Sequence, residues 1–273
     1  MEIKKLDVIT QEEVITCLLT AFSNYFVVLP DDVNYWKARY RAAQIDWNLS
    51  FGMFDGDKLV GFIINGIDVH EGKKTAYNSG TGVLPEYRGR AIVDQLYDHA
   101  LSEFQKSGIE KCLLEVICEN ERALKVYQRI GFKSRRKLFS YKGELPNSIT
   151  DSQLQNVTFG EILESGYYKA SNYSWDNLAK PVEISEVNKN SFFVTSEEGR
   201  SLGYFVLGPN GQVVQIEASE EKDISEVLKA IGKVTPALRF GNVPEHRKQL
   251  LNDLRSLGFE NTVNQYEMEM HLN

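Results

Sequence analysis

The sequence holds few residues of the kinds that build metal centres and disulfide frameworks. Its 273 residues include three cysteines and four histidines, and no Cys-x-x-Cys spacing occurs. Cys17, Cys112 and Cys118 are an odd number, and the last two border an apolar run, so we expect buried thiols in a reducing compartment. No histidine pairs with a cysteine at ligand spacing, and we therefore expect no metal site.

Long apolar runs and a surplus of basic residues are also missing. No run approaches the roughly 18 apolar residues that span a bilayer, and the N-terminus lacks the apolar core of a signal peptide. We therefore expect a cytoplasmic protein with no membrane partner. The net charge of −7 argues against a nucleic-acid partner and is compatible with a cationic amine as substrate.

The composition is that of a globular protein with room for two domains, since 42% of its residues are hydrophobic and 25% are charged. In the first half, the periodicity of apolar residues predicts alternating strands and helices. The expected strands are 2–8, 50–54, 58–66, 76–83, 111–118 and 138–142. The expected helices are 10–22, one after Pro30, 91–104 and 121–130.

The second half repeats parts of this pattern. A stretch rich in Gly, Pro, Asn and Ser at 144–153 predicts a linker between one domain at 1–143 and another at 154–273. Ile130-Gly131-Phe132 lines up with Leu257-Gly258-Phe259, and each is followed by a predicted strand. We therefore expect a diverged duplication. The strands expected there are 192–195, 201–207, 212–217 and 265–270, and the helices are 224–231 and 246–257.

The most informative stretch, Val83-Leu-Pro-Glu-Tyr-Arg-Gly-Arg-Ala91, lies between a predicted strand and an amphipathic helix. Such a turn directs main-chain N–H groups and the positive end of the helix dipole at the space before the helix. Gly89 and Ala91 would let an anion approach the backbone, and Arg88 and Arg90 could add charge-assisted bonds. Taken alone, the stretch fits a phosphate site and an ordinary surface turn about equally.

A second stretch places a tyrosine seven residues after an asparagine. Asn120 and Tyr127 are separated by two helical turns, so they share one face of the predicted helix. At that position Tyr127 could donate a proton to a departing thiolate as a general acid. The alternative is a core aromatic that packs with Ala123 and Ile130, and this stretch alone favours the core aromatic.

Together the two stretches resemble the Gcn5-related N-acetyltransferases (GNAT). Members of this family carry an acyl-CoA loop of the form Gln/Arg-x-x-Gly-x-Gly/Ala, and then a strand and a helix with Asn, Tyr seven residues on, and Gly-Phe. The resemblance covers about residues 1–143, and the predicted order of elements agrees. It implies an α/β (α+β) fold of two GNAT-like domains, each with a mixed, largely antiparallel central sheet flanked by helices.

The resemblance implies acetyl-CoA as co-substrate and assigns its contacts. Asn120 would contact the thiol-bearing arm of the coenzyme, and Tyr127 would be the general acid. The pantetheine arm would lie along the backbone of Thr81, Gly82 and Val83. The pyrophosphate would lie on Arg88, Gly89, Arg90, Ala91, Ile92 and Val93. The sequence departs from the family at Glu86, where Gln or Arg is usual, and at Ala91 and Val93, where many members have glycine.

The second half keeps the predicted fold but not the site. The alignment of the two Gly-Phe pairs sets Arg247 opposite Asn120 and Leu254 opposite Tyr127. The loop between Glu217 and Ile224 is acidic and free of glycine, so it would repel a pyrophosphate. We therefore expect a degenerate domain without cofactor.

The expected function is transfer of an acetyl group from acetyl-CoA to a small-molecule or peptide amine by direct attack. A strand N–H near Val83 would polarise the thioester carbonyl. The general base is left open among Glu115, Asp68, His70 and a water chain. The acceptor would contact the aromatic segments 22–26 and 35–36, or the second half, and a homodimer is allowed. The alternative is a non-catalytic acyl-CoA sensor or partner-docking protein on the same fold.

Overall fold

The computed structural model of the protein describes residues 1–146 and 150–272, and its chain divides into two compact units. Unit 1 comprises Met1–Arg135 together with the residues from Tyr266 onward, and unit 2 comprises Arg136–Gln265. The predicted linker at 144–153 contains residues 147–149, which lie outside the described residues. Strand β6 (Lys133–Glu144) ends at the first residue of this predicted linker, and β7 (Gln153–Val157) begins at its last residue.

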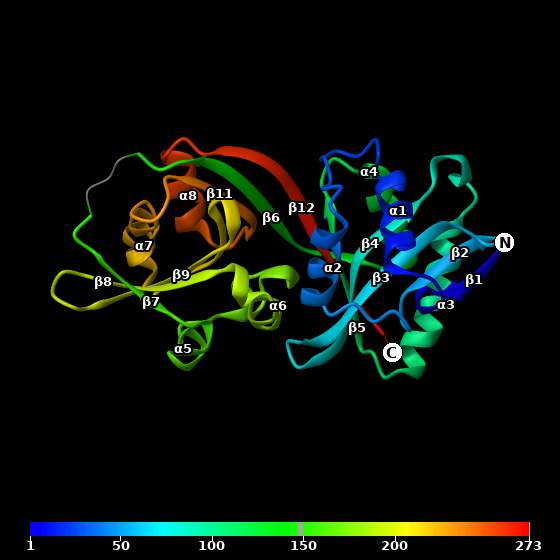
Figure 1. The fold of residues 1–273 in the computed structure, drawn as a ribbon, viewed down its shortest axis with the longest axis horizontal. Helices are drawn as coiled ribbons and strands as arrows, with labels where there is room; N and C mark the ends of the chain where they lie inside the picture. The colour runs from blue at the N-terminus through cyan, green and yellow to red at the C-terminus, as the bar shows by residue number, and fades with distance from the viewer. Residues whose placement is uncertain (147–149, 273) are drawn as a thin grey trace. The chain divides into compact units, whose positions relative to one another are not determined.

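Unit 1 is a mixed sheet covered by four helices (Figure 1). The first four strands pair antiparallel in sequence order, and β4 then pairs parallel with β5. The strands are β1 (Glu2–Lys5), β2 (Phe51–Asp55), β3 (Lys58–His70), β4 (Lys73–Val83) and β5 (Lys111–Ile117). The helices are α1 (Gln11–Ala21), α2 (Val33–Ala42), α3 (Ile92–Lys106) and α4 (Glu121–Ile130).

Glycines of the sheet show that α1 and α3 cover opposite faces. A Cβ on Gly82 would meet Ala21 of α1, and a Cβ on Gly61 would meet Ile92 of α3 at 2.8 Å. Gly61 is paired with Val83, so it shares the face of Val83 and not that of its neighbour Gly82. Both helices therefore approach the sheet closely where β3 and β4 lack side chains.

Unit 2 repeats this plan in a shorter form. Its strand order is β6-β11-β10-β9-β8-β7, in which β10 and β11 pair parallel and the other described pairs are antiparallel. The remaining strands are β8 (Asn190–Thr195), β9 (Ser201–Leu207), β10 (Gln212–Ala218) and β11 (Ala237–Pro244). The helices are α5 (Phe159–Glu164), α6 (Ala179–Ile184), α7 (Ile224–Ile231) and α8 (Lys248–Ser256). The predicted mixed, largely antiparallel sheet flanked by helices is confirmed in each unit.

The last strand, β12 (Glu260–His271), ends in unit 1 although the rest of the second half belongs to unit 2. Its final residues run beside β5 (Figure 1). Met268 is fully buried in the core that also contains Tyr127 and Phe132. Arg135 forms an ion pair with Glu267 of this strand and another with Glu71 of the β3–β4 turn. The sheet of unit 1 is therefore completed by the end of the chain.

Several short elements differ from the sequence prediction. The sequence did not predict the strands β7 and β11 or the helices α5 and α6. The two helices have only six residues each, which is too short for a clear helical pattern. Strand β11 is interrupted at Gly241-Asn242. Cys17 and Cys112 are buried free thiols as expected, whereas Cys118 is only half-buried. No helix in residues 1–146 and 150–272 is both long and apolar enough to cross a bilayer.

Because Met268 fills the core of unit 1, we predict that Met268→Ala lowers the free energy of unfolding of that unit by about 2–5 kcal/mol. Met268→Leu, which restores the volume, should cost less than about 1.5 kcal/mol. Hydrogen exchange of the β4 and β5 amides during denaturant titration measures this. Glu260→Ala, at an exposed position of the same strand, is the control. Equal losses in the Met268→Ala and Glu260→Ala variants would contradict the placement of β12.

Candidate functional site

Strands β4 and β5 separate in the middle of the unit 1 sheet. They pair from Thr75 with Lys111 to Asn78 with Leu114, and no pair follows although both strands continue. On the other side β4 stays paired with β3, with a shift in register between Gly80 and Asn78 that leaves Ser79 as a bulge. Residues 79–83 of β4 therefore present an unpaired main-chain edge inside the sheet.

The turn that follows β4 leads directly into α3. A 3-10 turn at Pro85–Tyr87 is followed by Gly89 and Ala91, both with left-handed backbone angles (φ 79° and 54°). Gly89, Arg90 and Ala91 donate no main-chain hydrogen bond to any residue of the described part of the chain. These amides and the free N–H groups of the first turn of α3 form a cup of unused donors, referred to below as the amide cup, and anion binding there stays a prediction.

Both arginines of this turn are held by the protein itself. Arg88 donates to the carbonyl oxygens of Val83 (3.2 Å) and Ala21 (2.8 Å), which ties the turn to the end of α1. Arg90 donates to the carbonyl oxygen of Glu86 and lies 4.9 Å from the ring centre of Tyr87. Their side chains shape the turn, so the donors that face an anion are mainly main-chain amides.

Two carboxylates near the cup are neutralised by cations. Glu86, the departure from the family pattern, pairs with Lys58 at 3.0 Å. Asp94, in the first turn of α3, accepts a bidentate interaction from Arg129 of α4, with distances of 2.6 and 2.8 Å to Nη2. Because both charges are compensated, neither opposes the binding of a second anion strongly.

Tyr127 lies beside the unpaired edge of β4. Its hydroxyl lies near the side chain of Thr81, and burial raises the pKa of Tyr127 to about 12. Asn78 donates to Thr81 Oγ1 (2.7 Å) and to the hydroxyl of Tyr97 (2.8 Å). The ring of Tyr127 also packs edge-on against Phe132, with centroids 5.8 Å apart. The ring of Tyr127 is therefore part of the core, and its role as a general acid stays a prediction.

Asn120 is the N-cap of α4 and lies near the loop between α1 and α2. Its Oδ1 accepts from the Ala123 amide at 3.1 Å, and its side chain lies near that of Tyr25. The sequence assigned Asn120 to the coenzyme and placed Tyr25 in an acceptor segment. The network of Asn78 and Tyr97 was missed, because its members are distant in sequence and meet only through the β4–α3 packing.

The three candidate bases lie at different places. His70 is the last residue of β3. It lies six residues after Ile64, which pairs with Gly80 beside the bulge, so the two residues are about 20 Å apart along the strand. It is buried against Lys111 Nζ at 2.9 Å, and burial lowers its pKa to about 4. Asp68 accepts from Gln44 in the same distant region. Glu115 alone of the three lies at the divergence, directly after Leu114, with a buried Oε1.

The equivalent place in unit 2 is filled by side chains. β10 and β11 pair only at Gln212 with Arg239 and Val213 with Phe240 before they separate. The carbonyl oxygen of Ile216 in the open edge accepts from Arg247 Nη1 (2.8 Å) and from Tyr173 (3.3 Å). Arg247 is the N-cap residue of α8, as Asn120 is of α4, and it pairs with buried Glu217 at 3.5 Å.

Known protein sequences match part of the chain. A family model described as "Acetyltransferase (GNAT) family" matches residues 18–132. The chain is 32% identical over 109 residues to N-alpha-acetyltransferase 30 of Schizosaccharomyces pombe, a match that covers 39% of this chain and 73% of that protein. It is 33% identical over 93 residues to N-alpha-acetyltransferase MAK3 of Arabidopsis thaliana, covering 34% of this chain and 49% of that protein.

Solved structures match the fold over the whole chain. A tandem GNAT protein from the clavulanic acid biosynthesis pathway superposes with a TM-score of 0.72 at 12% identity, covering 100% of this chain and 99% of that one. A GCN5-related N-acetyltransferase from Sphaerobacter thermophilus gives a TM-score of 0.70 at 8% identity, covering 100% and 96%. At these identities the likeness concerns the fold alone.

Proposed function

The chain belongs to the GNAT family of acetyltransferases, and we propose that it transfers an acetyl group from acetyl-CoA to a primary amine at a site in unit 1. The observation that carries this proposal is the unpaired edge of β4, which runs from the hydroxyl of Tyr127 to the amide cup at the start of α3. The names of the relatives in yeast and plant favour the α-amine of a peptide as acceptor.

The residues present fit acetyl-CoA. The amides of Gly89, Arg90 and Ala91 and the first turn of α3 would hold the pyrophosphate, with Ile92 and Val93 supplying the helical N–H groups. The backbone of Thr81, Gly82 and Val83 would pair with the amides of the pantetheine arm, because this edge of β4 has no strand partner. Arg88 and Arg90 would act by holding the turn, and Asn120 by contact with the thiol-bearing arm.

When bound, acetyl-CoA supplies a thioester whose carbonyl carbon accepts the amine. A main-chain N–H near Val83 would donate to the carbonyl oxygen as negative charge develops there. Tyr127 would donate its proton to the sulfur, because a hydroxyl with a pKa of about 12 remains protonated at neutral pH. Glu115 would take the proton of the amine, directly or through one water, since it lies at the divergence of β4 and β5.

Unit 2 would bind no acetyl-CoA in this proposal. Arg247 and Tyr173 occupy the edge of β10 that corresponds to the edge of β4. The loop before α7 is acidic, and Asp223 at its end pairs with Arg200 at 2.8 Å. One coenzyme per chain is therefore expected.

We predict that Tyr127→Phe lowers kcat by about 100-fold while the KM for acetyl-CoA changes little, because the ring packing remains and only the proton donor is lost. Release of CoA thiol with acetyl-CoA and a library of peptide and small-molecule amines measures this. Tyr204→Phe removes a buried, hydrogen-bonded hydroxyl of unit 2 and should leave kcat unchanged. If the wild-type chain binds acetyl-CoA but releases no thiol with any amine, the protein is a sensor and not an enzyme.

The proposed base generates a separate prediction. Glu115→Gln keeps the size of the side chain but cannot accept a proton, so kcat/KM should fall by about 100-fold and lose its dependence on pH on the acidic side. Initial rates measured across the pH range give this profile. The control is Glu121→Gln at an exposed position of α4. An acidic limb that persists in the Glu115→Gln variant would remove Glu115 from the mechanism.

A further inference from the structure

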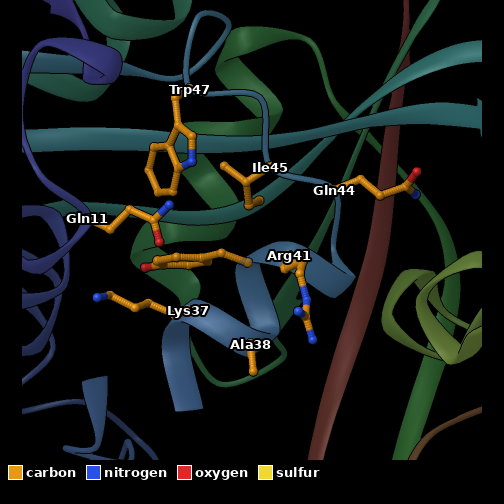
Figure 2. Close-up of a pocket in the computed structure, with 8 residues that line it drawn as sticks. Gln11, Lys37, Ala38, Arg41, Gln44, Ile45 and Trp47 are labelled. Atoms are coloured by element: carbon orange, nitrogen blue, oxygen red, sulfur yellow. The ribbon is translucent and has the colours of Figure 1, made fainter. Parts of the chain in front are cut away.

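Unit 1 contains a pocket whose lining residues differ from those of the proposed transfer site (Figure 2). Its volume is about 560 Å³, within the range of small-molecule sites. Figure 2 shows Trp47 and Ile45 on one side and Lys37 and Ala38 of α2 on the other. The lining residues are Gln11, Lys37, Ala38, Tyr40, Arg41, Gln44, Ile45 and Trp47.

The length of α1 separates this pocket from the amide cup. Gln11, which lines the pocket, is the first residue of α1, and Ala21, which accepts from Arg88 beside the cup, is the last. At 1.5 Å per residue the two ends are about 15 Å apart. A ligand in the pocket would therefore lie apart from the diphosphate proposed at the cup.

A buried hydroxyl in the wall of the pocket lacks a partner. Tyr40 is only 2% exposed, and its Oη makes no hydrogen bond with any residue in the described ranges. Such a group costs free energy unless a further molecule completes it. Burial also raises the pKa of Tyr40, so the hydroxyl stays protonated and can donate.

The other polar groups of the lining are mostly donors and cations. The indole N–H of Trp47 donates to no described residue, and Arg41 forms no ion pair within residues 1–146 and 150–272. Lys37 adds a second cation, one helical turn before Arg41.

The carboxylates that surround the pocket are already engaged. Glu12 pairs with Lys37, and Asp68 accepts from Gln44 at 2.7 Å. Asp46 accepts from the amides of Asn48 and Leu49. Asp46 and Asp68 keep their negative charge, so the pocket would hold an oxyanion through its unused donors and not through a surplus of positive charge. The donors without a partner among the described residues are those of Tyr40, Trp47 and Arg41.

Aromatic rings form the floor beside these donors. The rings of Tyr40 and Trp47 meet edge-on with centroids 5.4 Å apart, and Trp36 lies 5.9 Å from Tyr40 on its other side. A planar apolar ring of a ligand can pack on Trp47, while an oxyanion attached to that ring reaches the neighbouring donors.

We propose that this pocket binds a small organic anion, an aromatic ring that carries a carboxylate or a phosphate. The oxyanion would accept from Tyr40 and Arg41, and the ring would pack on Trp47 beside Ile45. The proposal is independent of the acetyl-transfer mechanism, because none of its residues belongs to that site.

The three tryptophans of the chain provide the readout. In ¹⁵N-labelled protein, benzoate and phenyl phosphate should each shift the indole N–H signal of Trp47 saturably. The signals of Trp36, whose N–H donates to Pro30, and of Trp175 should barely move. Trp47→Phe assigns the signal. Inorganic phosphate separates recognition of the bare oxyanion from recognition of the ring and should bind more weakly than phenyl phosphate.

Matched variants sharpen this test. Tyr40→Phe and Arg41→Gln should each weaken benzoate by about tenfold or more, as expected for one lost hydrogen bond to a charged group. Lys106→Gln, which removes an exposed cation of α3, should leave binding unchanged. Because its hydroxyl is unpartnered, Tyr40→Phe should keep or raise the Tm of the free protein, so a loss of binding would not reflect unfolding.

The following results would overturn the proposal. The first is a Trp47 signal that does not shift at millimolar benzoate and phenyl phosphate. The second is an affinity for benzylamine equal to that for benzoate, and the third is an affinity for inorganic phosphate equal to that for phenyl phosphate. The fourth is an affinity for benzoate that is unchanged in both the Tyr40→Phe and the Arg41→Gln variants.

Discussion

The chemistry proposed for this chain depends on a strand edge that is left unpaired inside a sheet. Main-chain N–H and C=O groups in a protein interior need partners, and beyond Asn78 β4 is paired with no strand on the side of β5, where Arg88 reaches only the Val83 carbonyl oxygen. A linear ligand with amide groups can supply them, in the way that a neighbouring strand would. The turn after β4 then delivers the chain to the N-terminus of α3, where an anion is favoured. One continuous segment would therefore serve both the arm and the diphosphate of a coenzyme.

The same constraint explains how two copies of one fold can differ in function. In unit 2 the strands β10 and β11 also separate, but a guanidinium and a phenol reach Ile216 from within the unit. The N-cap residue is Asn120 in helix α4 of unit 1 and Arg247 in helix α8 of unit 2. The longer side chain of Arg247 reaches the open edge of β10. In this interpretation unit 2 satisfies its open edge with its own residues and needs no coenzyme.

The sequence predicted most accurately those features that depend on local chemistry. The bounds of α4 follow from an asparagine cap and a glycine terminator, and both lie where predicted. The turn before α3 also lies where predicted, and the binding of a diphosphate by its amides stays a prediction. Register and topology were not accessible in this way. The distance of His70 from the divergence depends on the pairing of β3 with β4, and the entry of β12 into unit 1 depends on long-range packing.

The orientation of long side chains was likewise beyond the sequence. Arg88 and Arg90 were expected to add charge to the anion site, but both donate to carbonyl oxygens of the protein. Glu86, the departure from the family pattern, is compensated by Lys58, which precedes it by 28 residues. Such contacts are set by tertiary neighbours, and no spacing rule reports them.

Calorimetric titration of the purified chain with acetyl-CoA tests most directly whether the main chain between Arg88 and Val93 holds the coenzyme. One molecule per chain is expected. Ala91→Glu should weaken binding by at least about tenfold, because it adds an anion beside the cup. Lys222→Glu, which adds negative charge to the corresponding loop of unit 2, should have no effect. No binding at all, or a loss of binding in the Lys222→Glu variant alone, would contradict this assignment.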